Sequence, residues 1–196
     1  MKYFTQLKAA LFLASLIPFI RLIWYGYSSQ LGANPIEFIT RSLGTWTLVF
    51  ILITLTITPL RKLSGWSWLI KLRRMAGLFA FFYALLHFIT YIWLDQFFDL
   101  NSIYKDVIKR PFITIGFTAF ILLIPLALTS TNAMMKKLGG KRWQLLHRFI
   151  YLTAIFAVVH YWWLVKKDIT QPLIYAAILA ILLGYRVWIR WLKTGE

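Results

Sequence analysis

The chain carries three histidines, His87, His147 and His160, and each falls within a long apolar segment or at its edge. Ionisable side chains at membrane depth are costly, and those found there usually serve a function. Imidazole is one of the side chains that hold haem iron. The plainer alternative for one buried histidine is a neutral ring hydrogen-bonded to a neighbouring helix. These three side chains are therefore the first candidates for chemistry.

The depths of two of these histidines favour a shared iron. His87 lies 8 residues before Asp95, the charge that ends its apolar segment. His160 lies 6 residues before Lys166, at the same end of another segment. At 1.5 Å per helical residue, the two rings lie about 12 and 9 Å below that edge and share one level. Two imidazoles at one level on neighbouring helices can bind one haem iron from opposite faces.

His147 is placed differently. It precedes His160 by 13 residues, which is about 20 Å along an ideal helix. This separation suits two stations for electrons that cross a membrane. At 100° per residue, however, the two side chains project about 140° apart, and the sequence offers His147 no histidine partner. One haem is therefore expected at the first pair, and a second haem at His147 stays open.

Small residues share the face of His87. A helical projection at 100° per residue places these small residues in a smooth groove that could accept a flat macrocycle. Small residues also let two helices pack closely, which is the alternative explanation. The residues within about 80° of His87 are Arg73, Gly77, Ala80 and Ala84. Arg73 could meet a propionate or lipid headgroups, and Arg74 and Arg148 could also bind an anionic cofactor such as a flavin phosphate. We identify no catalytic side chain.

Membrane-spanning helices must position these residues. Apolar residues make up 60% of the chain, aromatic residues 18%, and the mean hydropathy is +0.69, all above the values of ordinary soluble domains. A hydrocarbon core needs about 20 helical residues per crossing, which leaves no room for a soluble catalytic domain. The predicted fold is a single all-α bundle of about six transmembrane helices over 1–196. The predicted spans are 7–27, 43–60, 75–94, 112–129, 146–165 and 172–190.

The basic residues predict the orientation. With both termini in the cytoplasm, 15 of the 22 Lys and Arg residues fall on the cytoplasmic side, 6 fall outside, and Arg21 lies within the first helix. The net charge of +16 therefore indicates membrane topology and not nucleic acid. The cytoplasmic set is Lys2, Lys8, Arg61, Lys62, Lys71, Arg73, Arg74, Lys136, Lys137, Lys141, Arg142, Arg148, Arg186, Arg190 and Lys193. The outer set is Arg41, Lys105, Lys109, Arg110, Lys166 and Lys167.

Several other chemistries are excluded or disfavoured. The absence of cysteine excludes disulfides, iron–sulfur clusters and covalent c-type haem. There is no H-E-x-x-H motif and no carboxylate cluster inside the predicted spans. The outer segment 95–110 mixes acidic and basic residues, which is typical of a solvated loop, although such a loop could also dock a partner domain.

Five segments resemble the MsrQ (YedZ) family, the haem-binding membrane subunits of bacterial MsrPQ systems, and more distantly the ferric-reductase transmembrane domain. The likeness covers nearly the whole chain. The segments are NPIEFITRSLGTWTL at 34–48, TPLRK at 58–62, RRMAGLFAFFYALLHFITYIWLD at 73–95, KRPFITIGF at 109–117 and PLALTSTNAMMKKLGGKRWQLLHRFIYLTAIFAVVHYWW at 125–163.

The resemblance implies a multi-pass b-type cytochrome of the bacterial inner membrane. Such a subunit takes electrons from the quinone pool, has an associated FMN, and reduces a periplasmic molybdopterin enzyme that repairs methionine sulfoxide in oxidised periplasmic proteins. His87, His147 and His160 match the family's haem-associated histidines. The wider superfamily places two histidines 13 or 14 apart on each of two helices, but the position 14 before His87 is Arg73. This departure favours one regular bis-histidine haem.

Two alternatives remain. The same haem chemistry would serve a ferric or oxygen reductase subunit that is supplied with electrons by a separate flavin reductase. A protein without redox work, such as a transporter or a membrane scaffold, would use the histidines only to stabilise helix contacts. An optical test separates these classes, because only a haem protein has a Soret band that responds to reductants.

Overall fold

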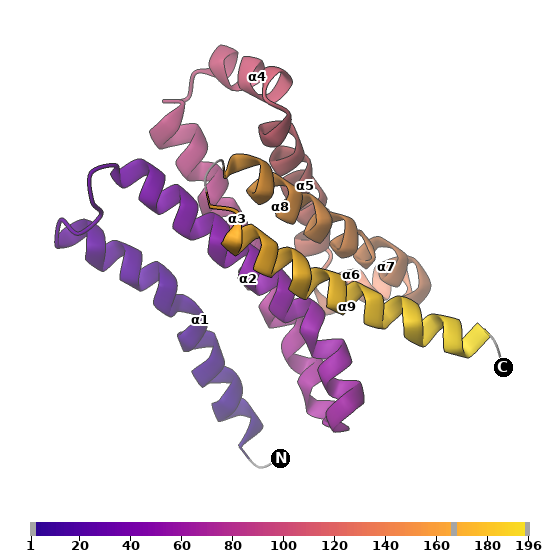
Figure 1. The fold of residues 1–196 in the computed structure, drawn as a ribbon. Coiled ribbons are helices and arrows are strands. Elements are labelled where there is room, and N and C mark those ends of the chain that lie inside the picture. Colours follow the sequence, from indigo (N-terminus) through magenta and orange to yellow (C-terminus); the bar gives the residue numbers. More distant parts are fainter. Residues whose placement is uncertain (1–2, 166–167, 195–196) are drawn as a thin grey trace.

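The computed structural model describes residues 3–165 and 168–194, without the side chains at 193 and 194, and within these residues all regular structure is helical. Figure 1 shows the helices as a bundle in which α4 lies across one end. The elements are α1 (Phe4–Tyr27), α2 (Pro35–Ser64), η1 (Ser67–Leu72), α3 (Arg73–Thr90), η2 (Tyr91–Asp95), α4 (Leu100–Lys109), α5 (Pro111–Leu128), α6 (Asn132–Leu138), α7 (Gly140–His147), α8 (Phe149–Leu164) and α9 (Thr170–Thr194).

Six candidate membrane spans occur among the described residues, which confirms the predicted all-α membrane fold. Each is long and apolar enough to cross a bilayer as a helix, the form in which every backbone group is satisfied internally. The spans are Phe4–Tyr27, Pro35–Ser64, Ser67–Asp95, Pro111–Leu128, Gly140–Leu164 and Thr170–Leu192.

The second span begins eight residues earlier than the predicted start at 43, because a capping motif precedes it. The Asn34 side chain accepts a hydrogen bond from the Glu37 backbone N–H at 3.2 Å, and Pro35 occupies the first helical position. Both features favour a helix start. The earlier start matters for the site, since it makes Thr40 and Arg41 helical.

The outer segment predicted as a loop contains a helix. Asp99 caps α4 by accepting from the backbone N–H groups of Asn101 and Ser102 at 3.0 and 3.3 Å. Near the other end, Asp106 pairs with Arg110 at 3.3 Å, one helical turn away. The mixed charges of this segment therefore belong to a capped amphipathic helix, and its apolar side chains Leu100, Tyr104 and Ile108 are exposed.

The fifth span is broken at Arg148, between α7 and α8. The Arg148 N–H donates to the Leu145 carbonyl at 3.2 Å, and the Tyr151 N–H donates to the Arg148 carbonyl at 3.0 Å. Bonds across three residues wind the chain more tightly than α-helical bonds across four. A helical projection at a uniform 100° per residue is therefore not valid across Arg148. His147 and His160 belong to separate helices, α7 and α8.

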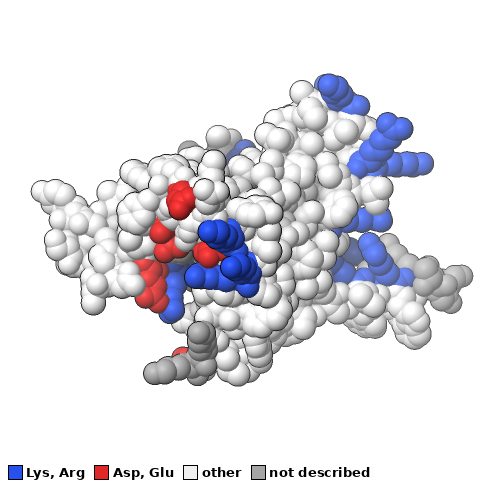
Figure 2. Space-filling view, turned by 90° about the horizontal axis from the view of Figure 1, so that it is seen from above, with Lys and Arg blue, Asp and Glu red and all other residues white. Residues whose placement is uncertain are grey.

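Charged side chains are unevenly distributed along the bundle. In Figure 2 the acidic side chains gather in one region beside basic ones, and only basic side chains appear toward the opposite end. We call the end at which α1 ends and α2 begins the outer end, after the predicted topology; the membrane orientation itself stays a prediction. Lys2, Lys166 and Lys167, which entered the charge count, lie outside the described residues, as does the side chain of Lys193.

An aromatic core joins the first three spans. The rings of Phe50 and Tyr83 stack with centroids 5.4 Å apart, and Phe50 also stacks on Phe79 at 5.4 Å. Tyr83 is fully buried, and its hydroxyl donates to the Ser15 carbonyl at 2.6 Å. This hydrogen bond ties α3 to α1, a helix that is otherwise mostly exposed in the isolated chain.

The Tyr83 hydrogen bond yields a stability prediction. Tyr83→Phe keeps the ring and removes the hydroxyl, so we expect the free energy of unfolding to fall by about 0.5–1.5 kcal/mol. Thermal unfolding of the detergent-solubilised protein measures it. Tyr104→Phe on α4 is the matched control, because that residue is 68% exposed. Equal stabilities for the two variants would contradict the assigned hydrogen bond.

Candidate functional site

The rings of His87 on α3 and His160 on α8 lie side by side. Their centroids are 6.3 Å apart and their planes are inclined by 76°. Rings this close agree with the shared level that their spacing from the helix ends predicted. The structure thus brings together, from segments more than 70 residues apart, two of the three histidines that the sequence singled out.

Each of these rings is held through Nδ1 by a backbone carbonyl of a neighbouring helix. His87 Nδ1 donates to the Thr40 carbonyl of α2 at 2.9 Å, and His160 Nδ1 donates to the Phe112 carbonyl of α5 at 2.7 Å. A carbonyl can only accept, so Nδ1 carries the proton and Nε2 of the neutral ring keeps its lone pair. This is the arrangement that orients a histidine for metal binding.

A glycine lies one turn below each of these carbonyls. A Cβ at Gly44, four residues after Thr40, would lie 3.1 Å from His87 Cε1. A Cβ at Gly116, four residues after Phe112, would lie only 2.6 Å from His160 Nδ1. The same device, an accepting carbonyl followed by a glycine four residues later, therefore holds both imidazoles against a helix backbone. No larger residue leaves the rings this room.

These supporting residues were not recognised from the sequence pattern. Thr40 and Phe112 act through main-chain carbonyls, which leave no trace in residue type. Gly44 and Gly116 did carry a signal, because a glycine inside an apolar helix costs about 1 kcal/mol relative to alanine and needs a packing reason.

An outer cavity of about 540 Å³ surrounds the histidine pair. Its walls come from α2, α3, α5 and α8, and small residues such as Ala84 and Ala157 line it. Three buried side-chain oxygens lack a hydrogen-bond partner among the described residues, and all three residues line this cavity: Thr40, Tyr91 and Thr153. An unsatisfied buried polar group costs about 1–3 kcal/mol. Their clustering here indicates a cavity built for a ligand with polar groups.

The pair also fits a metal held inside a macrocycle. An imidazole nitrogen binds a metal at about 2.0–2.1 Å and its ring centroid lies about 1.1–1.2 Å behind, so two rings on opposite sides of one ion have centroids about 6.2–6.6 Å apart. The measured 6.3 Å falls in that range. The described residues contain no group of three or more His, Cys, Asp or Glu side chains that could hold an ion. Two imidazoles alone are too few for a bare metal site, so the other ligands would have to come from a cofactor.

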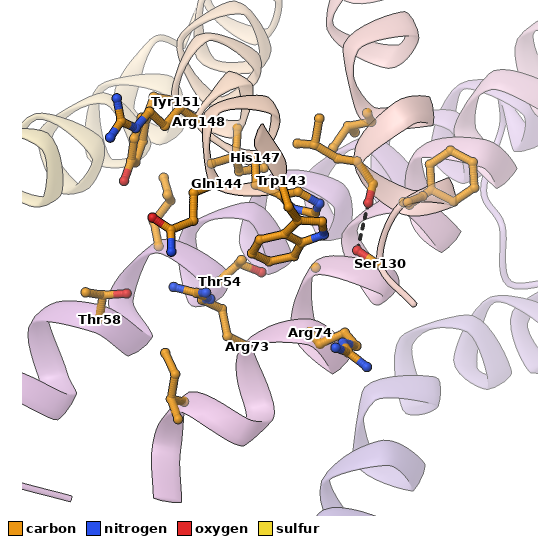
Figure 3. Close-up of a pocket in the computed structure, with 18 of the residues that line it drawn as sticks. Thr54, Thr58, Arg73, Arg74, Ser130, Trp143, Gln144, His147, Arg148 and Tyr151 are labelled. Carbon is orange, nitrogen blue, oxygen red and sulfur yellow. Dashed lines mark hydrogen bonds between the residues drawn. The ribbon is translucent and has the colours of Figure 1, made fainter. Parts of the chain in front are cut away.

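A second, inner cavity of about 480 Å³ lies between the same helices and the short α7. The structure gathers here the basic residues that the sequence proposed for an anionic cofactor, Arg73, Arg74 and Arg148, together with His147. Figure 3 shows Arg73 of α3 facing Trp143 and Gln144 of α7, with Arg74 off to one side. Clustered cations in a partly enclosed space favour an anionic or strongly polar ligand.

His147 differs from the other two histidines in its contacts. Its ring stacks on Trp143 with centroids 3.8 Å apart, and its Nε2 lies 3.0 Å from Thr129 Oγ1. The single proton of that hydroxyl goes to the Pro125 carbonyl at 2.6 Å, so Nε2 must be the donor. Nε2 of His147 is therefore occupied, and its lone pair lies on Nδ1. Among the described residues that line this cavity there is no second histidine.

Arg186 of α9 belongs to the inner cavity and was missed by the sequence analysis, which counted it only as a topology charge. Its guanidinium donates to the Leu182 carbonyl at 2.6 Å, donates to the Leu55 carbonyl of α2, and lies 5.5 Å from the ring centre of Tyr151. These contacts hold the side chain between α2, α8 and α9. In the sequence, Arg186 resembles an ordinary arginine near a helix end, so its position between helices was not predicted.

The residues of the predicted small-residue groove on α3 lie in three different environments. Gly77 lines the inner cavity, Ala84 lines the outer cavity, and Ala80 is fully buried in the core between them. Leu123 of α5 lines both cavities. The two cavities are therefore neighbours along the bundle and are separated by packed side chains.

Known proteins are similar in sequence to this chain over most of its length. Residues 40–158 match the family described as "Ferric reductase like transmembrane component". A protein of Herminiimonas arsenicoxydans named "Protein-methionine-sulfoxide reductase heme-binding subunit MsrQ" is 61% identical over 194 residues, which cover 98% of this chain and 89% of the relative. The chain belongs to the MsrQ family within the ferric reductase-like membrane proteins.

Other MsrQ proteins are similar over almost the same range. The relative from Ralstonia nicotianae is 53% identical over 97% of this chain and 88% of its own length. The relative from Rhodospirillum rubrum is 51% identical over 92% of this chain and 86% of its own length. Both carry the same name, so the predicted family is confirmed.

Three helical glycines of this MsrQ-family chain offer a graded test of the imidazole packing. Gly116→Ala would press a methyl group against His160, and we expect a loss of about 1–3 kcal/mol in the free energy of unfolding, typical of overpacking. At Gly77 the added Cβ would meet Thr54 at an ordinary 3.8 Å, so Gly77→Ala should be neutral or stabilising by up to about 1 kcal/mol. Gly44→Ala should fall between them.

Chemical or thermal unfolding in one detergent provides the comparison. All three changes add one methyl group inside a helix, so differences between them report the space beside each glycine. If Gly116→Ala and Gly77→Ala had the same stability, the close approach of His160 to α5 would be refuted.

Proposed function

We propose that this chain is the haem-bearing electron-transfer subunit of a methionine sulfoxide reductase system of the bacterial inner membrane. One observation carries the proposal: two imidazoles 6.3 Å apart, each anchored through Nδ1 to a carbonyl, face a cavity with unsatisfied polar atoms. The name of its relatives, heme-binding subunits, supports the same chemistry.

The residues of the outer cavity have separate roles in this proposal. His87 and His160 would hold the iron of haem b from its two sides, and the carbonyls of Thr40 and Phe112 keep the two rings in the required tautomer. A bound haem supplies one-electron redox chemistry, while the protein sets its ligands, orientation and surroundings. The buried side chains of Leu48 and Ile51 exclude water from the inner part of the cavity.

The inner cavity is the proposed entry point for electrons. Its arginines can donate hydrogen bonds to the oxygens of a quinol headgroup from the membrane pool or to the phosphate of an FMN, and Nδ1 of His147 can accept one from a quinol hydroxyl. The lone pair on Nδ1 of His147 also keeps open the second haem that the family pattern suggests. With the predicted topology, electrons enter near the cytoplasmic side and leave on the periplasmic side.

The proposed recipient is a periplasmic molybdopterin-containing reductase that repairs methionine sulfoxide in oxidised proteins. The relatives' name, which assigns them to a protein-methionine-sulfoxide reductase, supports a partner of this activity. A ferric or oxygen reductase would use the same histidine pair but would need a separate flavin reductase as its electron source. A transporter or scaffold would require no metal ligand, and the free Nε2 atoms of both rings argue against that class.

The histidine pair can be tested optically. We expect purified protein to show a Soret band and the low-spin bands of a six-coordinate b-type haem, and we expect His87→Ala or His160→Ala to abolish the low-spin signature. His147→Ala is the control within the same chain, because its ring lies in the other cavity, and the low-spin signature should survive.

A protein without a Soret band would refute the proposed function and favour the scaffold alternative. Full retention of the low-spin spectrum in His87→Ala would refute the assignment of the ligands. Haem content per protein, measured alongside, tells whether His147 contributes a second haem.

The proposed entry of electrons at the inner cavity predicts a kinetic effect. Arg73→Gln removes a charged donor worth about 1.5–3 kcal/mol, so reduction of the protein by a soluble quinol analogue should slow about 10- to 150-fold. Reduction by dithionite, a small reductant that needs no quinol site, should be unchanged. Lys62→Gln is the matched control, because Lys62 is exposed and does not line the cavity. Equal quinol rates in the two variants would exclude Arg73 from the entry site.

A further inference from the structure

The outer cavity has one polar end and one apolar end. At its outer end, basic and hydroxyl side chains from three elements line it: Arg41 on α2, Tyr91 on η2 and Arg110 immediately before α5. At its inner end the lining residues include Ile51, Leu123 and Thr153, which are almost completely buried. This asymmetry gives a bound molecule a preferred orientation.

We infer that the outer rim, defined as Thr40, Arg41, Tyr91 and Arg110, binds the two propionate carboxylates of a haem in the outer cavity. The propionate edge of the macrocycle then faces the outer end of the bundle, and the apolar edge faces Ile51 and Leu123. The inference rests on the proposed function, because it requires haem between His87 and His160.

The two arginines supply charge and spare donors. Arg41 pairs with Glu37 at 2.6 Å, and Arg110 pairs with Asp106 through its Nε atom at 3.3 Å. A guanidinium carries five N–H donors, so each arginine can bind a propionate in addition to its present carboxylate. Haem presents two carboxylates on one edge, and the rim offers two arginines on different helices to receive them.

Two hydroxyl groups complete the rim. The Tyr91 hydroxyl is buried and forms no well-formed hydrogen bond, although the Asp106 carboxylate lies close enough to compete as its acceptor and Asp95 and Arg110 are also near. The Thr40 hydroxyl is likewise buried and unpartnered. An ionised propionate only accepts hydrogen bonds, so it would satisfy both groups. Because the Thr40 carbonyl also holds His87 Nδ1, one residue would contact the axial ligand and the propionate edge.

The opposite orientation is much less favourable. Among the described residues that line the inner end there is no cation, and Thr153 has the one unpartnered hydroxyl there. A carboxylate buried against Ile51 and Leu123 would have no compensating charge, which is costly. Glu37 and Asp95 also line the outer end and would repel a propionate, so the spare donors of both arginines are needed to bind it there.

A comparison of haem with haem dimethyl ester tests this inference. Haem-free protein is titrated with each compound, and the ratio of the two affinities reports the contribution of the carboxylates alone. We expect unmodified protein to prefer haem by at least tenfold. Arg41→Gln, Arg110→Gln and Tyr91→Phe should each reduce that preference about 3- to 10-fold, less than the about 10- to 150-fold of a fully buried hydrogen bond to a charged group, because both arginines are half-exposed.

Two control variants mark the alternatives. Lys109→Gln removes an exposed charge next to Arg110, and Thr153→Val removes the hydroxyl at the inner end; neither should change the preference. Arg110→Lys, which keeps the charge, should retain more of it than Arg110→Gln. Both compounds are measured on every variant, and only the ratio of the two affinities is compared between variants. Differences in solubility between the two compounds therefore cancel.

The outcomes are distinct. A protein that binds haem with a low-spin spectrum but shows no preference over the ester would overturn the inference and leave the proposed function intact. A preference lowered by Thr153→Val and unaffected by Arg110→Gln would place the propionates at the inner end. Absence of haem binding by the unmodified protein would overturn both.

Discussion

Two hydrogen bonds between helices are the interactions on which the site depends. His87 reaches the Thr40 carbonyl of α2, and His160 reaches the Phe112 carbonyl of α5. Each bond fixes a ring tautomer and draws two spans together, and in each case a glycine one turn further along the accepting helix leaves room for the ring. A carbonyl has a second lone pair, so it can accept from an imidazole while it takes part in its helix. The bundle thus positions two nitrogens without any polar side chain as second partner, which suits a membrane interior where such side chains are costly.

The two cavities differ in the chemistry that their walls permit. The outer one holds a histidine pair with free Nε2 atoms, and its charges are confined to one end. The inner one holds a single histidine whose Nε2 is already occupied by Thr129, and arginines from α3, α9 and the α7–α8 junction surround it. A site of the first kind suits a large apolar cofactor with an anionic edge. A site of the second kind suits a smaller polar ligand that exchanges with its surroundings.

The sequence was sufficient to predict the spans and the shared level of His87 and His160, because both follow from helix rise and apolar length, which are local properties. It also named Arg73, Arg74 and Arg148 as candidates for binding an anion, and the structure gathers them at the inner cavity. It did not reveal the accepting carbonyls or the role of Gly116, since a main-chain contact between distant segments has no residue signature. It also missed α4, whose Asp99 cap was masked by mixed charges, and the break at Arg148, which a uniform helical projection cannot represent.

Leu123 lines the outer cavity and the inner cavity at once, in a packed core where side chains occupy discrete rotamers. A change in its rotamer that enlarges one cavity therefore reshapes the other. If ligands in the two cavities require different positions of Leu123, their affinities are linked: whatever factor one ligand applies to the affinity of the other, the second applies in return. A substitution at Leu123 would therefore alter both cavities at once, although this side chain contributes no polar group to either.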